Sequence, residues 1–204
     1  MLELLVKNGE CVNPDSSFHA DIAVENGRIV QIGKNLNLKA EQVIDAAGKQ
    51  VLPGIVDSHV HLPWPSVSFD SVDDFDSGTT AAVFGGVTTI IEYIVPDESG
   101  RIIPSLESEI GKAEKTSRCD YSFHLILRKV TDETLKDMEE AFRRGFTSFK
   151  VYTAYSGFRL EDDAVLKVLE KARQLGAIVC FHAEDGVLVD FASAQLAREG
   201  KTQI

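Results

Sequence analysis

From about residue 50 onward the sequence repeats one pattern, in which a short apolar run typical of a buried strand precedes a segment with helical periodicity. The segments between the runs predict helices over about 72–84, 104–117, 131–144 and 161–175, with a fifth from about residue 185. Repeated strand–helix units of roughly 30 residues predict parallel strands joined by right-handed crossovers, and therefore an α/β fold. The apolar runs centre near Val56, Ile90, His124, Lys150 and Cys180.

Two architectures contain such units, an open doubly wound sheet and a (β/α)₈ barrel. No Gly-x-Gly-x-x-Gly follows the first strand, which weakens the dinucleotide-binding form of the doubly wound sheet. Only about five units fit between Val51 and Ile204, whereas a barrel has eight strands and typically ~250 residues. An unclosed barrel would leave parallel edges and an apolar interior exposed. If the fold is a barrel, we expect this sequence to be the N-terminal part of a longer protein, inactive and poorly soluble alone.

Residues 1–50 follow a different pattern, with short β runs separated by turn residues. Asn8-Gly9 and Asn26-Gly27 each follow a β run. Asn-Gly is a strong hairpin signal, because both central residues of a type I′ turn need a positive φ. We therefore predict a small, mostly antiparallel β module over 1–50 and a separate barrel part over 51–204.

Composition argues against a nucleic-acid-binding protein, a membrane protein and a disulfide-rich protein. The 204 residues include 32 acidic and 21 basic side chains, a net charge of −11, which argues against nucleic acid as a partner. No apolar run approaches the ~20 residues of a membrane span, and the N-terminus does not resemble a signal peptide. The three cysteines are far apart and match neither a disulfide framework nor a C-x-x-C site. We expect a cytoplasmic protein without a membrane partner.

The first strand of the barrel part ends in His59-Val60-His61. Residues i and i+2 of a strand face the same side, so His59 and His61 point together, with Asp57 on the same face. Two imidazoles at the carboxyl end of a barrel strand can chelate one divalent metal ion. A pair of polar residues at a strand end is the simpler alternative, and the apolar strand before them with its Asp favours the metal site.

Two further strands carry chemically useful side chains. Lys150 lies inside an apolar strand, where burial lowers the pKa of an amine and a neutral amine can react with CO₂ to form a carbamate. On spacing alone, a lysine that snorkels to the strand end or pairs with an acid explains it better. His182 ends the fifth strand, at the same kind of position as His59 and His61. Together these side chains are hard to explain as core filling.

The remaining candidates lie in loops or within the sheet. Tyr155 follows the Lys150 strand and could donate a hydrogen bond to an oxyanion, or simply pack on its neighbours. The loop from Leu62 to Phe69 holds Trp64 and two prolines, and predicts an apolar lip at a substrate mouth or a subunit contact. Phe158 could line the same mouth. For His124 we expect a hydrogen-bonded core histidine, and for His19 a solvated side chain.

These residues, in this order, resemble the amidohydrolase superfamily and, within it, the hydantoinase and dihydropyrimidinase family of cyclic amidases. The resemblance covers essentially the whole chain. The matching stretches are Gly54–Leu62, Ala81–Ile90, Asp120–His124, Thr147–Tyr155 and Phe181–Gly186.

The resemblance implies a (β/α)₈ barrel with a small β-sandwich, and a centre with two divalent metal ions, expected to be Zn²⁺. In such a centre His59 and His61 would hold the first ion, carboxylated Lys150 would bridge both, and His182 would hold the second. A metal-bridging hydroxide would open a cyclic amide or ureide ring to an N-carbamoyl amino acid, with Tyr155 stabilising the oxyanion. The resemblance also implies a homotetramer. The family's strand-six His and strand-eight Asp have no counterpart within these 204 residues.

Two groups of alternatives remain open. Allantoinases and dihydroorotases resemble the same plan, but dihydroorotases carry an Arg soon after H-x-H, where this sequence has Leu62-Pro63-Trp64-Pro65. The spacing from Lys150 to Tyr155 looks more like that of the hydantoinase branch. Some relatives of dihydropyrimidinase lack the metal ligands and act as scaffold proteins. Every ligand position covered here is filled, which favours an enzyme.

Overall fold

The computed structural model describes residues 1–62 and 71–202. The chain divides into two compact units, Met1–Gly54 and Ile55–Ile204. The first unit is a five-stranded sheet in the order β3-β2-β1-β4, with β5 also paired to β1. β1–β2 and β2–β3 are antiparallel, whereas β4 and β5 run parallel to β1. The strands are β1 (Leu2–Asn13), β2 (Ser16–Glu25), β3 (Arg28–Gly33), β4 (Ala40–Asp45) and β5 (Gln50–Val51).

The two Asn-Gly pairs of this unit have different outcomes. Asn26 and Gly27, both with positive φ, turn β2 into β3 as predicted. The hairpin predicted at Asn8-Gly9 is wrong, because β1 runs straight through the pair with a bulge in its pairing to β2. The left-handed Asn8 is held inside the sheet, since its N–H donates to Asp21 at 2.8 Å. A Cβ on Gly9 would lie 2.6 Å from the Val51 side chain, so glycine is needed for β5 to pack there.

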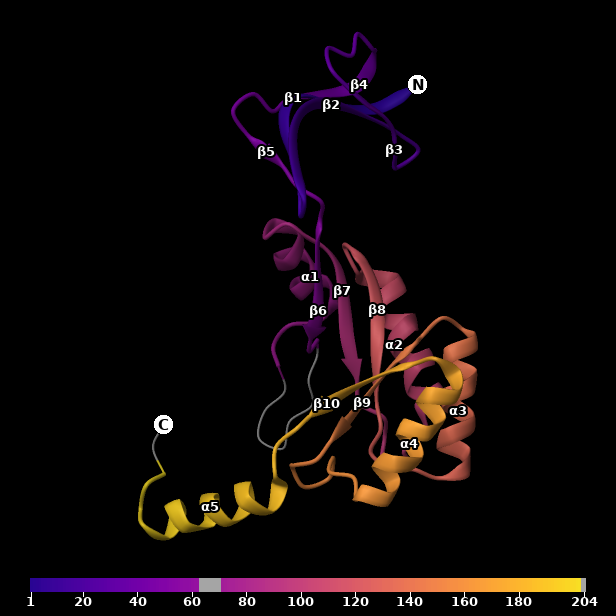
Figure 1. The fold of residues 1–204 in the computed structure, drawn as a ribbon, viewed down its shortest axis with the longest axis vertical. Helices are drawn as coiled ribbons and strands as arrows, with labels where there is room; N and C mark the ends of the chain where they lie inside the picture. The colour runs from indigo at the N-terminus through magenta and orange to yellow at the C-terminus, as the bar shows by residue number, and fades with distance from the viewer. Residues whose placement is uncertain (63–70, 203–204) are drawn as a thin grey trace. The chain divides into compact units, whose positions relative to one another are not determined.

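The second unit alternates strands and helices, and its five strands pair in parallel in the order β6-β7-β8-β9-β10 (Figure 1). A doubly wound sheet reverses its strand order, so this uniform order is that of successive strands of a (β/α)₈ barrel. The α/β fold predicted from the repeat is confirmed. The elements are β6 (Ile55–Val60), α1 (Phe75–Phe84), β7 (Val87–Ile94), α2 (Ile102–Thr116), β8 (Asp120–Ile126), α3 (Asp132–Arg143), β9 (Ser148–Tyr152), α4 (Asp162–Leu175), β10 (Ile178–His182) and α5 (Gly186–Arg198).

Local capping chemistry sets several helix ends. The Thr131 side chain accepts from the backbone N–H of Thr134 and opens α3, as the sequence predicted. Gly176 closes α4 in the left-handed conformation, and Gly145 follows α3 with a positive φ. Asp74 caps α1, which therefore begins at Phe75 rather than near residue 72.

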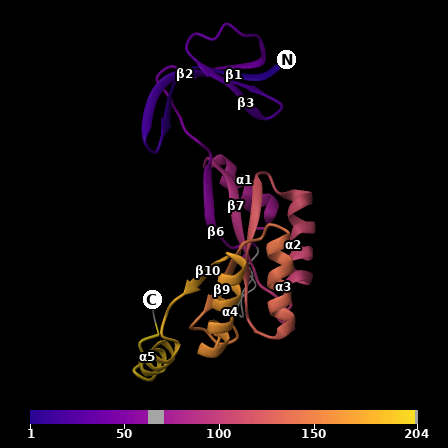
Figure 2. The same cartoon turned by 45° about the vertical axis from the view of Figure 1, so that its right-hand side comes forward.

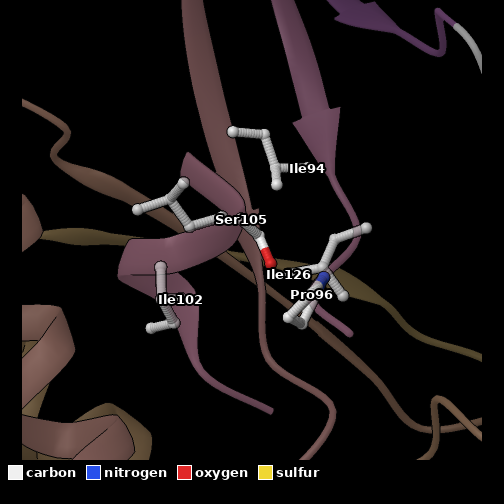
Figure 3. A pocket seen from close by; sticks show the side chains of 6 residues that line it. Ile94, Pro96, Ile102, Ser105 and Ile126 are labelled. Atoms are coloured by element: carbon white, nitrogen blue, oxygen red, sulfur yellow. The ribbon is translucent and has the colours of Figure 1, made fainter. Parts of the chain in front are cut away.

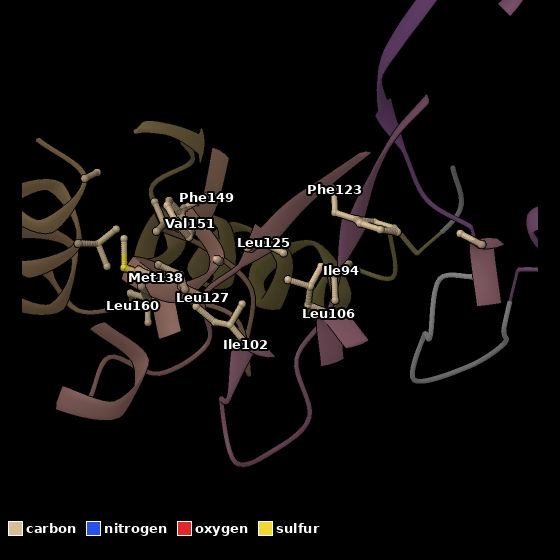
Figure 4. Packing of buried hydrophobic residues seen from close by; sticks show 14 of the residues in the cluster. Ile94, Ile102, Leu106, Phe123, Leu125, Leu127, Met138, Phe149, Val151 and Leu160 are labelled. Carbon is tan, nitrogen blue, oxygen red and sulfur yellow. The ribbon is translucent and has the colours of Figure 1, made fainter. Parts of the chain in front are cut away.

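The core of this unit lies between the central strands and helices α2, α3 and α4 (Figure 4). Helices α2 and α3 pack side by side along the sheet (Figure 2). The edge strand β6 is different, because Ile55 and Val56 leave more than half of their surface exposed. Completely buried core residues include Leu106, Met138, Phe149, Val151 and Val168.

A small apolar junction closes the unit between the end of β7 and the first turn of α2 (Figure 3). It leaves no room for a water-sized molecule, so it belongs to the packing rather than to a binding site. It is lined by Ile94, Pro96, Ile102, Ser105, Leu125 and Ile126.

A buried carboxylate joins α3 to the start of α2. Asp137 accepts two hydrogen bonds from the Arg101 guanidinium, at 2.7 and 2.8 Å, and one from the Ile102 N–H at 3.0 Å. Burial alone would raise the pKa of Asp137, but these hydrogen bonds outweigh it and lower the pKa below its ordinary value. The folded state therefore prefers the charged carboxylate.

Within the described residues, none of the helices combines the length and apolar character that crossing a membrane requires.

Leu106→Ala tests the core. Leu106 is fully buried, so removing its side chain should lower the free energy of unfolding by about 2–5 kcal/mol in urea denaturation of the chain. Leu166→Ala on α4 is the matched control, since Leu166 is 65% exposed and should change stability little. Equal losses in the two variants would contradict this description of the core.

Asp137→Asn tests the junction of α2 and α3. The variant should lose about 2 kcal/mol of unfolding free energy at neutral pH, because a charge-assisted hydrogen-bond network is lost. A carboxyl whose folded pKa is depressed stabilises the protein above its unfolded pKa and loses this effect as the pH falls. The difference between wild type and variant should therefore shrink as the pH drops below the ordinary value of 3.8. A difference that stays constant with pH would refute the assignment.

Candidate metal centre

The first pair of candidate ligands lies at the end of β6. His59 is in the strand and His61 follows its last residue, and their ring centroids are 5.2 Å apart. Tyr93 of β7 lies against both rings, with centroid distances of 4.7 and 5.1 Å. The i, i+2 spacing thus brings the two imidazoles together over one aromatic ring, as expected for neighbours on one face of a strand.

The surroundings of His61 keep its imidazole neutral. Burial, together with the nearby positive charges of His59 and Lys150, lowers the pKa of His61 to about 4. At neutral pH its ring is therefore neutral, which is the form that binds a metal ion.

Lys150 lies in the middle of β9 and is 4% exposed. Its Nζ is 5.3 Å from the centroid of the Tyr93 ring and 5.0 Å from that of Tyr152. Burial lowers the pKa of Lys150, and no acidic partner accompanies it among the described ion pairs. Among the described residues no acid therefore pairs with Lys150, and the side chain does not snorkel to solvent.

His182 ends β10 on the other side of Lys150. Its ring stacks on Tyr152 at a centroid distance of 5.4 Å. The β9–β10 register pairs Tyr152 with His182 and Lys150 with Cys180. The parallel register therefore places His182 two residue pairs beyond Lys150, toward the carboxyl edge of the sheet.

Glu184 is a site residue that the sequence analysis missed. Its Oε1 accepts from the Tyr155 hydroxyl at 2.6 Å and also contacts Nε2 of His182. The hydrogen bonds from Tyr155 and His182 lower the pKa of Glu184. The available signal was its spacing, two residues after His182.

Tyr155 has a strained backbone, with φ at +70° in a residue other than glycine. Strain of this kind persists where the surroundings over-determine the conformation, as at many functional sites. Its ring lies 4.9 Å from that of His182, and its hydroxyl donates to Glu184. The hydrogen bond to Glu184 raises the pKa of the Tyr155 phenol, which keeps it protonated and able to donate.

His124 is a hydrogen-bonded core histidine, and that expectation is confirmed. Its Nδ1 is 2.6 Å from Ser148 Oγ and its Nε2 is 3.0 Å from the Ser58 carbonyl oxygen. Burial lowers its pKa, so the ring is neutral. Because a carbonyl only accepts, Nε2 carries the proton and Nδ1 accepts from the Ser148 hydroxyl.

Glu92 of β7 is a second residue that the sequence analysis missed. It is 2% exposed, and its Oε1 accepts from the Leu62 N–H at 2.6 Å. Its Oε2 is buried without a hydrogen-bond partner among the described residues. Burial raises the pKa of Glu92 to about 8, against the opposing effect of the Leu62 N–H. An acid inside the apolar run Ile90–Ile94 was the available signal.

The predicted substrate contacts are less defined. Leu62 packs against α1, where a Cβ on Gly78 would come within 2.6 Å of it. Phe158 packs on Tyr152 at 5.2 Å, beneath the Arg128 guanidinium. Trp64 lies outside the described residues. The substrate-binding roles of these three residues stay predictions.

The loops after β7, β8 and β9 enclose a polar hollow of about 310 Å³. They follow the carboxyl ends of the strands, the edge at which barrel enzymes bind their substrates. The hollow is lined by Asp97, Glu98, Arg128, Lys129, Gly157 and Arg159.

Over the described residues, no three His, Cys, Asp or Glu side chains converge as a metal-binding group. The ligands predicted from the sequence are three histidines and a lysine, and a lysine is not one of these four residue types. Two tyrosine rings connect Lys150 to the histidines. Its Nζ lies 5.3 Å from the centroid of Tyr93, which contacts His59 and His61, and 5.0 Å from that of Tyr152, which contacts His182.

Known proteins are similar to this chain in sequence and in fold. The sequence pattern of the amidohydrolase family matches residues 50–195. A D-hydantoinase from Geobacillus stearothermophilus is 38% identical over 200 residues, which make up 97% of this chain and 42% of that protein. A dihydropyrimidinase from Dictyostelium discoideum is 37% identical over 202 residues, 98% of this chain and 40% of that protein.

The structural comparison agrees. A crystal structure of D-hydantoinase superposes with a TM-score of 0.94 and 36% identity, covering all of this chain and 44% of that one. The chain thus spans roughly two fifths of the length of these relatives, with 42% and 40% of the two curated proteins covered.

Proposed function

The chain belongs to the amidohydrolase family, and we propose that the whole protein opens cyclic amide or ureide rings, such as hydantoins and dihydropyrimidines, by metal-dependent hydrolysis. The product would be an N-carbamoyl amino acid. The proposal rests on the site and on similarity to D-hydantoinases and dihydropyrimidinases, the names that these relatives carry.

One observation carries the proposal. Lys150 is buried with no acidic partner among the described residues, and the histidines on either side of it lie at the carboxyl ends of parallel strands of the same sheet. A lysine in this position costs stability unless it is neutral or modified, so a functional use explains it better than packing does.

The donor set fits divalent zinc, because neutral imidazoles are common zinc ligands. We propose that His59 and His61 hold one ion, that His182 holds a second, and that Lys150 bridges them. When bound, the ions would lower the pKa of a coordinated water and polarise the amide carbonyl. His61 is ready for this role because burial keeps its ring unprotonated.

Lys150 would bridge as a carbamate. Its neutral amine would attack the carbon of CO₂, forming a C–N bond while one C=O π bond breaks onto oxygen, and one proton would pass from the nitrogen to water, so that the side chain would end in an anionic carboxylate. Burial lowers the pKa of Lys150 and so increases the fraction of reactive amine. The buried negative charge of the carbamate would in turn be balanced by the bound cations.

Tyr155 would act on the substrate. Its phenol is protonated and exposed near His182. In the reaction its hydroxyl would turn from Glu184 to the developing oxyanion of the ring carbonyl and donate a hydrogen bond there. The left-handed backbone at Tyr155 would keep the ring beside His182 while the hydroxyl changes its partner.

For the whole protein we further propose a cytoplasmic location, from the cysteine usage, and a homotetrameric assembly, from the family resemblance. A small-molecule cyclic amide is the proposed partner. Allantoin and dihydroorotate are the alternative rings, and a metal-free scaffold is the alternative of another class.

His61→Asn tests the metal centre. The wild-type chain, incubated with Zn²⁺ and desalted, should retain zinc by atomic emission, and the variant should retain less because one imidazole donor is gone. His19→Asn in β2 is the control and should retain the wild-type amount. Equal zinc in His61→Asn and wild type would contradict the assignment, and a whole protein without bound zinc would favour the scaffold.

Tyr155→Phe tests the proposed reaction. The zinc-loaded whole protein should hydrolyse hydantoin or dihydrouracil faster than allantoin or dihydroorotate. The variant should lose roughly a hundredfold in kcat, the usual effect of removing one oxyanion donor. Tyr121→Phe in β8 is the control and should keep full activity. Unchanged kcat in Tyr155→Phe would refute the role of the phenol.

A further inference from the structure

The backbone that carries His59 and His61 is not held by regular strand pairing. The β6–β7 register pairs Asp57 with Ile90 and Val60 with Glu92, so three steps on β6 match two on β7. This is a bulge immediately before and within the H-x-H segment. Bulges re-aim side chains next to active sites, and they interrupt the ladder of backbone hydrogen bonds.

Two buried side chains from neighbouring strands hold this segment instead. On one side of H-x-H, His124 of β8 donates from Nε2 to the Ser58 carbonyl at 3.0 Å. On the other side, Glu92 of β7 accepts from the Leu62 N–H at 2.6 Å. His124 is 8% exposed and Glu92 is 2% exposed, so both side chains reach these partly buried bonds from the interior of the unit.

A second hydrogen bond, on the other ring nitrogen of His124, orients the imidazole for its contact with Ser58. Ser148 of β9 donates to Nδ1 of His124, which fixes the tautomer that donates to Ser58. Cys180 of β10 lies 3.7 Å from the same hydroxyl. Side chains from three adjacent strands, β8, β9 and β10, thus form a polar line that ends on the backbone of β6.

The Glu92 contact does not depend on its charge. A carboxyl oxygen accepts the Leu62 N–H whether or not the other oxygen carries a proton, so protonation leaves the bond in place. A glutamine amide oxygen can do the same, whereas a leucine of similar size cannot.

We propose that Glu92 and His124 form a clamp, a pair of positioning residues that fix the backbone on each side of His59 and His61 and thereby set their affinity for a divalent metal ion. The inference rests on the proposed function for the role of the two histidines as ligands. Neither clamp residue would touch the metal ion, so each acts only through the backbone.

The test compares Glu92→Leu with Glu92→Gln in the full chain. Zn²⁺ affinity is measured by competition with a chromogenic chelator, and Leu62 amide exchange is measured by NMR without metal. Glu92→Leu should speed Leu62 exchange and weaken Zn²⁺ binding about tenfold to hundredfold, the usual effect of disturbing the groups that orient ligands. Glu92→Gln should retain most of both properties.

Asp137→Leu is the matched control. Asp137 is also a buried carboxylate that accepts from a backbone N–H, but at the start of α2. This variant should lose stability while keeping Leu62 exchange and Zn²⁺ affinity. Wild-type Zn²⁺ affinity in Glu92→Leu, or an equal loss in Asp137→Leu, would overturn the proposal.

If Glu92→Leu does not fold, Ser148→Ala tests the proposal through the contact between His124 and the Ser58 carbonyl. It removes one hydroxyl and frees the tautomer of His124, so Zn²⁺ affinity should fall several-fold; unchanged affinity would overturn the proposal. Failure of the proposed function looks different. The wild-type chain would then bind no Zn²⁺, while the exchange difference between Glu92→Leu and Glu92→Gln persisted and supported the clamp on the backbone.

Discussion

Parallel pairing of β6 to β10 is the constraint on which the rest of the structure depends. Parallel strands in chain order bring all their carboxyl ends to one edge, so side chains far apart in sequence meet there. The alternation of faces then selects among them, and His59 and His61 share a face because they are two residues apart. The register pairs Tyr152 with His182, which stack on each other next to Lys150. The site is thus a consequence of the strand order.

Burial at this edge acts on its polar groups in one direction. It lowers the pKa of His61 and Lys150 and raises that of Glu92, so each is driven toward its neutral form. For an imidazole or an amine, the neutral form is the one with a lone pair to give. For Glu92 it is a form that still accepts a hydrogen bond. The same desolvation that makes these residues costly to bury therefore prepares them for their proposed roles.

The sequence was informative where one local rule decides the outcome. Apolar runs located the five strands of the second unit, and the caps at Thr131 and Gly176 located helix ends. It failed at Asn8-Gly9, because tertiary hydrogen bonds to Asp21 and close packing on Val51 turn a hairpin signal into a bulge. In the site, the strand-end histidines and Lys150 could be singled out by position. Tyr155 as a partner of Glu184 and the Leu62 N–H as the partner of Glu92 could not be assigned, since both lie about 30 residues away in the sequence.

The bulge at the end of β6 explains why a strand as apolar as β7 carries an acid. Extra length in β6 re-aims the histidines, but it interrupts the ladder that would otherwise satisfy nearby backbone groups. Backbone groups that lose water without gaining a partner are costly, and side chains supply partners to two partly buried groups here. An N–H needs an acceptor and a carbonyl needs a donor, which Glu92 and a His124 fixed in one tautomer by Ser148 provide. The irregular strand and the buried polar residues beside it are therefore joined by hydrogen bonds at each side of the two histidines.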